Sequence, residues 1–151
     1  ANYLIEIGGE VRAKGLNLKK NQSWLIGIES PEVNGDGRRI DKVLEITNQS
    51  MASSGNYRKF KEDARTGRKY VHTVNPQRCR AEENAITSAT VIAATCAEAD
   101  AYATAIMAMG LERTKQLLSE RPDLQVYFTY HDQANEPRWY ATPNLLDRLK
   151  Q

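Results

Sequence analysis

The chain has 151 residues, of which 40% are hydrophobic and 26% are charged, and its formal net charge is +2. This length suits one globular domain with a core of its own and is too short for two comfortable domains. The nearly balanced charge excludes a dominant electrostatic partner. We expect no nucleic-acid binding, because nucleic-acid-binding proteins normally carry a stronger basic face. The basic residues between 58 and 69 are interrupted by Glu62 and Asp63, so this segment predicts a solvated hairpin or loop.

The cysteines and the apolar runs exclude further classes of protein. Cys79 and Cys96 make no disulfide framework, neither belongs to a zinc-binding pattern, and they leave the redox compartment open. The longest apolar runs are shorter than the roughly 18 residues that a membrane helix needs. The N-terminus lacks a basic region followed by an apolar core, and the chain is strand-like from Tyr3 onward. We therefore expect a fragment or a mature product whose preceding portion is missing.

The first half of the chain predicts strands. Tyr3, Ile5 and Ile7 recur at every second position and are followed by Gly8 and Gly9, which predicts a strand that ends in a turn. Asn, Gly and Asp residues predict a second turn, and a run of small polar residues predicts a loop. The segments concerned are the turn at 34–37, the loop at 48–56, and further strands at 24–29, 43–47 and 69–74.

The second half of the chain mixes strands with helices. The apolar run at 89–94 predicts a strand that leads into a helix, because Thr95 and Glu98 have the spacing of a capping box. The helix begins near Cys96, is rich in alanine and ends at Gly110. This order of elements favours an α+β domain with a mixed or antiparallel sheet and packed helices. The remaining predictions are an amphipathic helix at 111–120, strands at 124–130 and 138–141, and a terminal helix at 143–150.

Asp100 and Thr104 are candidate metal ligands on the first of these helices. Residues four apart project from the same face of a helix, so a carboxylate lies beside a hydroxyl. Two hard oxygen donors suit Mg²⁺, which fills its remaining positions with waters and substrate phosphates. The same spacing also fits an ordinary helix, in which Asp near the N-terminus stabilises the macrodipole. Spacing alone leaves both interpretations open.

His72 is the candidate general base among the isolated polar residues. It lies at the end of a predicted strand, beside the turn at Asn75 and Pro76. A histidine with an unperturbed pKa of about 6.5 can accept a proton near neutral pH. Isolated histidines are more often structural or exposed, and chain order alone establishes no Ser-His-Asp or Cys-His arrangement.

Six segments that cover nearly the whole chain carry a family resemblance, at 3–10, 24–31, 52–57, 72–76, 88–91 and 98–104. In this order they resemble the C-terminal part of the ApbE family, the flavin transferases that move FMN from FAD onto a Ser or Thr of a target protein. The resemblance implies a T-fold-like domain, of which residues 1–151 form the C-terminal portion while the N-terminal part of the family pattern is absent.

The resemblance gives individual residues roles. Asp100 and Thr104 fall on the family's Mg²⁺-binding helix positions, and Ala103 stands where some relatives carry a further acidic residue. His72 falls on the family's histidine beside the flavin, which makes it a candidate for deprotonating the target hydroxyl or for positioning the isoalloxazine. The backbone of Val74 falls on a flavin-contacting position. The turn at 8–10 and the segment at 53–57 belong to the surroundings of the family's active site, without individual roles.

The implied reaction is phosphoryl transfer at the pyrophosphate of FAD. FAD is the substrate, and the partner is an acceptor flavoprotein whose Ser or Thr hydroxyl attacks the FMN phosphorus. Mg²⁺ polarises the diphosphate and stabilises the charge on the departing AMP. Because relatives are usually exported, many as lipoproteins, the resemblance also implies a periplasmic location, with an inner-membrane tether in the full-length precursor.

Two departures from the family pattern keep other functions open. Arg78 and Cys79 stand where relatives carry Thr and Gly, and Ala81 replaces a usual proline. We expect a weakened flavin loop, because only Gly reaches positive φ without strain. The Lys-Gly segment and a backbone metal ligand of the N-terminal half are absent, so the chain alone is expected to be incapable of turnover. The alternatives are an FAD pyrophosphatase that yields FMN and AMP, and a non-catalytic flavin-binding or interaction module.

Overall fold

The structure is a computed structural model of the chain, and it describes residues 1–31, 39–56, 60–62, 69–71, 74–76, 79–81 and 84–150. The strands of the first half are β1 (Tyr3–Ile7), β2 (Glu10–Lys14), β3 (Trp24–Glu29), β4 (Ile40–Ile46), β5 (Ser50–Gly55), β6 (Phe60–Glu62), β7 (Lys69–Val71), β8 (Val74–Asn75) and β9 (Arg80–Ala81). The second half contains β10 (Ile86–Ala93), α1 (Cys96–Met109), α2 (Leu111–Glu120), β11 (Gln125–His131), β12 (Pro137–Ala141), α3 (Pro143–Leu146) and β13 (Leu149–Lys150).

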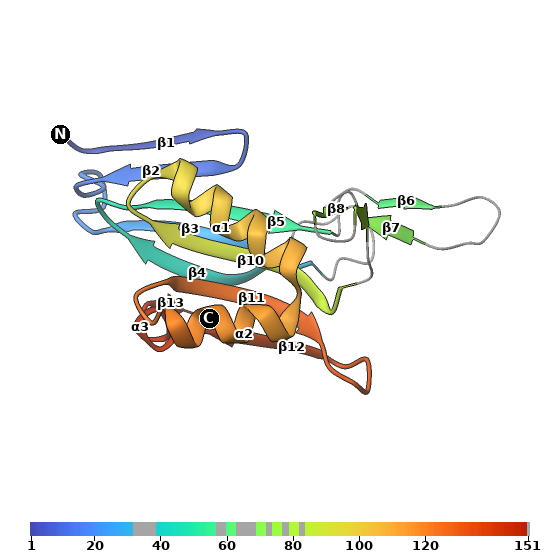
Figure 1. The fold of residues 1–151 in the computed structure, drawn as a ribbon. Coiled ribbons are helices and arrows are strands. Elements are labelled where there is room, and N and C mark those ends of the chain that lie inside the picture. Colours follow the sequence, from blue (N-terminus) through green and yellow to red (C-terminus); the bar gives the residue numbers. More distant parts are fainter. Residues whose placement is uncertain are drawn as a thin grey trace.

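The centre of the fold is a six-stranded sheet in the order β1-β2-β5-β10-β11-β12 (Figure 1). A three-stranded sheet in the order β13-β4-β3 accompanies it, and β6-β7 and β8-β9 form two short ribbons. Neighbouring strands in both larger sheets run antiparallel. The predicted α+β class with an antiparallel sheet is therefore confirmed.

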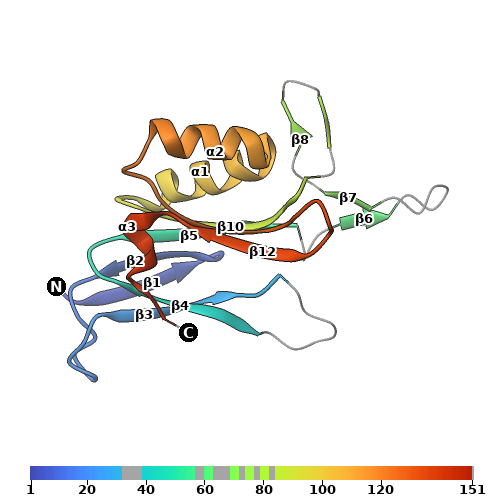
Figure 2. The same cartoon turned by 90° about the horizontal axis from the view of Figure 1, so that it is seen from below.

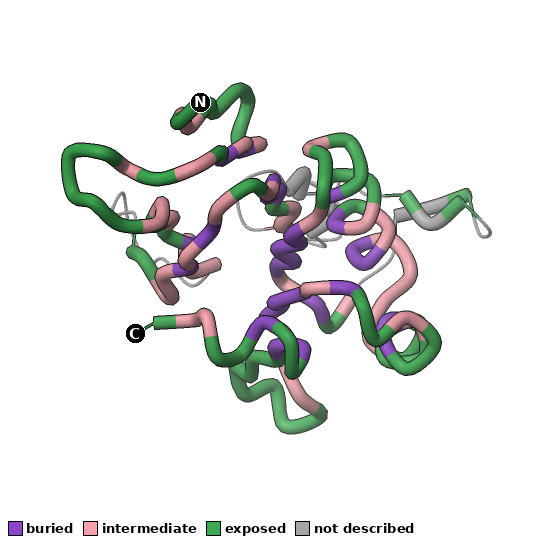
Figure 3. The backbone as a smooth tube through the Cα atoms, turned by 90° about the vertical axis from the view of Figure 1, so that its left-hand side faces the viewer, coloured by how far each residue is buried: buried purple, intermediate pink, exposed green. Residues whose placement is uncertain are grey.

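The elements are stacked in three layers (Figure 2). Helices α1 and α2 cover one face of the six-stranded sheet, and the small sheet covers the other. Side chains alternate along each strand, so β10 contributes to the packing on both faces of the main sheet. Val91 packs with the helices, and Ile92 packs with the small sheet. Buried residues accordingly gather between the layers (Figure 3). None of the helices in the described part of the chain is both long and apolar enough to cross a membrane.

Helix α1 begins and ends where the sequence predicts. The hydroxyl of Thr95 accepts a hydrogen bond from the Glu98 N–H at 3.2 Å, which caps the first turn. Gly110 has a φ of 80° and closes the helix by donating its N–H to the Ile106 carbonyl. Ala99 and Ala103 are fully buried, so the backbone of α1 lies close to β5 and β10. The helix is thereby fixed against the strands that carry the site.

The predicted loop at 48–56 is wrong, because it contains β5, an interior strand of the main sheet. Its residues pair with β10 from Ser50 to Gly55, and its first part also pairs with β2. The ladder hydrogen bonds and the burial of Met51 override the weak strand preference of serine and glycine. Strand β2 itself was not predicted. The register of this pairing fixes the position of each serine along β5 and the face of the sheet on which its side chain lies.

Other boundaries also differ from the prediction. The terminal helix covers only Pro143–Leu146, because Arg148 donates to the Glu45 carbonyl and the Gln49 side chain, both at 2.7 Å, and β13 then pairs with β4. Burial of the Arg148 guanidinium lowers its pKa. The predicted strand at 69–74 is described as β7 and the start of β8. The predicted turn at 34–37 lies outside the described residues.

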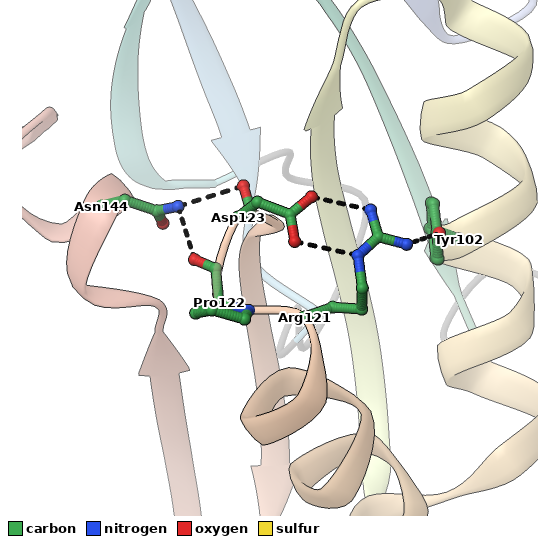
Figure 4. A network of polar contacts seen from close by, with 5 residues as sticks. All are labelled: Tyr102, Arg121, Pro122, Asp123 and Asn144. Atoms are coloured by element: carbon green, nitrogen blue, oxygen red, sulfur yellow. Dashed lines mark hydrogen bonds and ion pairs between the residues drawn. The ribbon is translucent and has the colours of Figure 1, made fainter.

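Arg121 ties the end of α2 to α1 (Figure 4). Its guanidinium donates to both carboxylate oxygens of Asp123, at 2.9 and 2.7 Å, and to the Tyr102 hydroxyl of α1 at 2.8 Å. This pairing lowers the pKa of the Asp123 carboxyl and raises the pKa of Arg121. The Asn144 amide donates to the carbonyls of Pro122 and Asp123, both at 3.2 Å. The network therefore joins α1, the turn after α2, and α3.

Candidate functional site

An open cavity of about 1400 Å³ lies beside α1 and the second half of β5. Its walls come from the β1-β2 turn, from β3, from β5, from residues 74 and 76, and from one face of α1. The volume exceeds the roughly 300–1,000 Å³ that ordinary small-molecule pockets have. The cavity is therefore large enough for an extended ligand such as a dinucleotide.

The separation of β2 from β5 opens this cavity. The ladder between these strands has only two partner pairs, Val11 with Met51 and Arg12 with Ser50. Beyond them β5 continues to Gly55 with β10 as its neighbour, while β2 leads back into the β1-β2 turn. The turn and the end of β5 thus become separate walls of the cavity.

Helix α1 presents Asp100 and Thr104 to the cavity. Both side chains are exposed and line it, one helical turn apart, while the residues directly before them, Ala99 and Ala103, are fully buried on the neighbouring side of the helix. The start of the helix is fixed by Arg12, whose guanidinium donates to the Ala94 carbonyl at 2.6 Å. The structure therefore brings the two predicted ligand residues together on a rigid element. Their role as metal ligands stays a prediction.

The serines of β5 add hydroxyls to the same cavity. Ser54 Oγ lies 3.3 Å from Thr104 Oγ1, and Ser53 Oγ lies 2.8 Å from Thr90 Oγ1. Successive residues of a strand face opposite sides of its sheet, so Ser54 faces α1 and Ser53 faces the small sheet. Sequence reasoning placed this segment near the site but gave its members no roles. The signal was hidden because small polar residues predict a loop as readily as a strand.

The charged side chains on the described part of the cavity wall are acidic. Among the lining residues that the structure describes, the charged side chains are Glu6, Glu10, Glu29 and Asp100, and none is basic. A phosphate group placed against this wall is repelled unless a cation lies between the two. A cation between this described wall and an anionic ligand would therefore reduce the repulsion between them.

The other predicted site residues have different outcomes. Val74 is exposed and lines the cavity, and its predicted contact with the flavin stays a prediction. His72 and Arg78 lie outside the described residues. Cys79 is an exposed free thiol with a φ of 51°, in the left-handed region that favours glycine. The backbone conformation suited to glycine is thus present without the glycine. Cys96 is also a free thiol.

The donor set at α1 fits Mg²⁺ in part. Within the described ranges, no group of three or more His, Cys, Asp or Glu side chains gathers as a complete metal cage. Mg²⁺ does not require one, because it is commonly held by one or two carboxylates together with waters and substrate phosphates. Asp100 supplies a carboxylate, Thr104 a hydroxyl oxygen, and the cavity leaves space for the remaining ligands. The residues present therefore fit the ion as two of its ligands.

The fold agrees with comparisons to known proteins. The family model described as "ApbE family" matches residues 1–128. A protein of Haemophilus influenzae named FAD:protein FMN transferase is 36% identical over 126 residues, covering 83% of this chain. One of the same name from Vibrio cholerae is 41% identical over 112 residues, covering 74% of the chain. A solved structure, flavin transferase ApbE from Vibrio cholerae, superimposes with a TM-score of 0.80 over 97% of the chain at 31% identity.

These matches define the class of the protein as flavin-transferase-like in fold. The chain belongs to the ApbE family. It spans about a third of the length of the curated relatives, 35% and 32% of the two named above, and 44% of the Vibrio cholerae structure.

Proposed function

We propose that this chain is the C-terminal portion of a Mg²⁺-dependent flavin transferase, which moves FMN from FAD onto a Ser or Thr hydroxyl of an acceptor protein and releases AMP. The observation that carries the proposal is that Asp100 and Thr104, one helical turn apart, both line a cavity whose described charged side chains are all acidic. Its relatives bear the name FAD:protein FMN transferase. The pyrophosphate of FAD is an anion, and a cation bound at Asp100 would reduce its repulsion from the acidic side chains of this wall.

The residues of the chain have distinct tasks in this proposal. Asp100 would hold the ion through its carboxylate, and Thr104 through its hydroxyl oxygen. When bound, Mg²⁺ supplies positive charge that offsets the charge developing on the leaving phosphate. The packing of α1 on β5 and β10 keeps both ligands in place. Val74, which is exposed and lines the cavity, would contact the flavin end of the substrate through its backbone.

His72 has one of two roles in this proposal, and both are predictions from the sequence. It accepts the proton of the acceptor hydroxyl, or it positions the isoalloxazine. A His72→Gln variant distinguishes them, because loss of the base lowers transfer while FAD affinity is retained. A loss of FAD affinity instead supports the positioning role.

The test of the proposed function uses the complete natural polypeptide that carries this chain. It is incubated with FAD, Mg²⁺ and an acceptor domain, and the products are separated by mass spectrometry and chromatography. FMN attached covalently to the acceptor, with AMP released in equal amount, supports transfer. Free FMN and AMP with an unmodified acceptor support the pyrophosphatase, in which water replaces the acceptor hydroxyl. Neither product, with FAD bound, supports the non-catalytic module.

The module is favoured by the backbone at Cys79, whose positive φ is carried by a residue other than glycine. A double variant, Arg78→Thr with Cys79→Gly, restores the residues that relatives carry. A gain of transfer in this variant indicates an impaired flavin loop in an enzyme. Unchanged inactivity with intact FAD binding favours the module.

A further inference from the structure

Ser54 and Thr104 form a hydroxyl pair that joins β5 to α1 beside the cavity. The two oxygens are 3.3 Å apart, Ser54 is half-buried, and both side chains line the cavity. We infer that Ser54 is a positioning residue, which holds the Thr104 hydroxyl in the orientation needed to bind the metal ion. This inference rests on the proposed Mg²⁺ site at Asp100 and Thr104.

A threonine hydroxyl that binds a metal ion is better oriented when a fixed partner accepts its proton. A hydroxyl has one proton and two lone pairs, and a lone pair can face the ion only if the proton points elsewhere. In a helix, a threonine hydroxyl also has a competing acceptor, the backbone carbonyl one turn earlier, and its side chain therefore divides between two rotamers. When Ser54 accepts the proton, the Thr104 oxygen stays on the cavity side with a lone pair free for the ion.

The position of Ser54 is fixed by the fold. It lies on an interior strand, where it is the register partner of Ala89 in β10. Helix α1 packs on the same face through the fully buried Ala103, directly before Thr104 in sequence. The distance between the two hydroxyls therefore follows from strand pairing and helix packing. Partners that orient a metal ligand in this way typically account for about 10- to 100-fold in metal affinity.

Ser53 provides a matched control in the neighbouring position. It also lines the cavity, but its side chain faces the small sheet and not α1. There its hydroxyl lies 2.8 Å from the hydroxyl of Thr90. The change Ser53→Ala removes a hydroxyl from the same strand and the same cavity without touching Thr104. Only the change at position 54 should therefore weaken the metal site.

The test is a titration of the complete polypeptide with Mn²⁺, followed by electron paramagnetic resonance, with Mg²⁺ as competitor. We expect Ser54→Ala to weaken Mn²⁺ binding by about 10-fold or more. Ser53→Ala should leave the affinity within about two-fold of the unmodified protein, since it removes no neighbour of a ligand. Ser54→Thr, which keeps a hydroxyl, should restore it. Unchanged affinity in Ser54→Ala, or an equal loss in Ser53→Ala, overturns the inference.

A double-mutant cycle separates positioning from a general structural effect. If Ser54 acts through Thr104, the variant Thr104→Val should lose at least as much affinity as Ser54→Ala, and the double variant should lose no more than Thr104→Val alone. Additive losses overturn the inference. Melting temperatures are measured for each variant, and Ser54→Cys replaces the alanine variant if that one fails to fold.

The Asp100→Ala variant distinguishes a wrong metal site from a wrong role for Ser54. If Asp100→Ala binds Mn²⁺ as well as the unmodified protein does, the metal site and the function built on it are overturned. If Asp100→Ala loses binding while Ser54→Ala keeps it, only the role of Ser54 is overturned.

Discussion

Two aspartates near α1 have opposite surroundings. Asp123 receives hydrogen bonds on both carboxylate oxygens from Arg121, which in turn donates to Tyr102 of the helix. Asp100, two residues before Tyr102 on the same helix, is exposed at the cavity beside Thr104. Within the described part of the chain, no side chain is paired with it. The Asp123 carboxylate thus contributes to the fold, whereas the exposed Asp100 carboxylate is accessible from the cavity.

The same contrast distinguishes the two hydroxyl pairs of β5. Ser53 and Thr90 satisfy each other at a short distance, 2.8 Å, with Thr90 buried. Ser54 and Thr104 lie at 3.3 Å, longer than the roughly 2.7–2.8 Å typical of hydroxyl pairs. Apo sites often have such long contacts, which tighten when the ligand arrives. The looser contact of Ser54 with Thr104 thus agrees with the proposal that this side of the cavity binds the substrate.

The largest effect is expected from Asp100→Ala. Loss of the only carboxylate that α1 turns toward the cavity should lower Mg²⁺-dependent flavin transfer by about 100-fold or more, equal to at least about 2.7 kcal/mol of transition-state stabilisation. The melting temperature should stay unchanged, because exposed substitutions rarely affect stability. Transfer assays at limiting Mg²⁺, with the melting curve alongside, measure both. Undiminished activity at limiting Mg²⁺ contradicts the assignment.

The next effect concerns the rigidity of α1. Ile106 is fully buried among the residues that fix the helix to the sheet. Replacing it with alanine should reduce the free energy of unfolding by about 2–5 kcal/mol, through lost apolar contact and a cavity. Urea unfolding measures this loss. A loss well below this range indicates that α1 is loosely attached, and the fixed geometry of Asp100 and Thr104 then fails.

A smaller effect is expected at Asp123, where the change should alter the pH dependence of stability. Pairing with Arg121 lowers the pKa of this carboxyl in the folded protein, so its stabilisation is present above the ordinary carboxyl pKa. The stabilisation is lost as the pH falls through the depressed folded-state pKa. Melting temperatures measured from pH 6 downward should therefore fall less steeply in Asp123→Asn than in the unmodified protein. The difference should be small, because the pair is exposed. Parallel profiles exclude a stabilising role for the pair.

The smallest effect is expected at Cys79. Its φ of 51° is strained for a residue with a Cβ, and Cys79→Gly removes that strain. Glycine also loses more chain entropy on folding, so the net gain should be at most about 1 kcal/mol. The matched change Cys96→Gly, in the first turn of α1, should lower stability instead, because glycine is unfavourable in helices. Equal effects at the two positions, measured by urea unfolding, contradict the interpretation.

Much of the fold was predictable because its local signals are strong. The cap at Thr95, the glycine at 110 and the alternation at 3–7 each correspond to an observed boundary. The juxtaposition of Asp100 with Thr104 followed from helix geometry alone. Residues within one element are related by a fixed period, which makes such pairs readable in the sequence.

The remainder of the site depends on pairing between distant segments. Ser54 reaches Thr104 across 50 positions of sequence, through the register of β5 with β10 and the packing of α1 on both. Serine and glycine have weak strand preferences, so no local pattern marked β5 as an interior strand. The early end of α3 likewise depends on Arg148, which contacts a carbonyl 103 positions away. Where the local propensity of a segment is weak, such tertiary contacts determine its secondary structure.

The most direct test of the account compares its two aspartates as metal ligands. The complete polypeptide, with Asp100→Asn and Asp123→Asn as matched variants, is titrated with Mn²⁺ in the presence of FAD. The account predicts that Asp100→Asn lowers Mn²⁺ affinity by about 100-fold or more, while Asp123→Asn binds like the unmodified protein. Unaltered binding in Asp100→Asn would contradict the central claim that α1 carries the metal site.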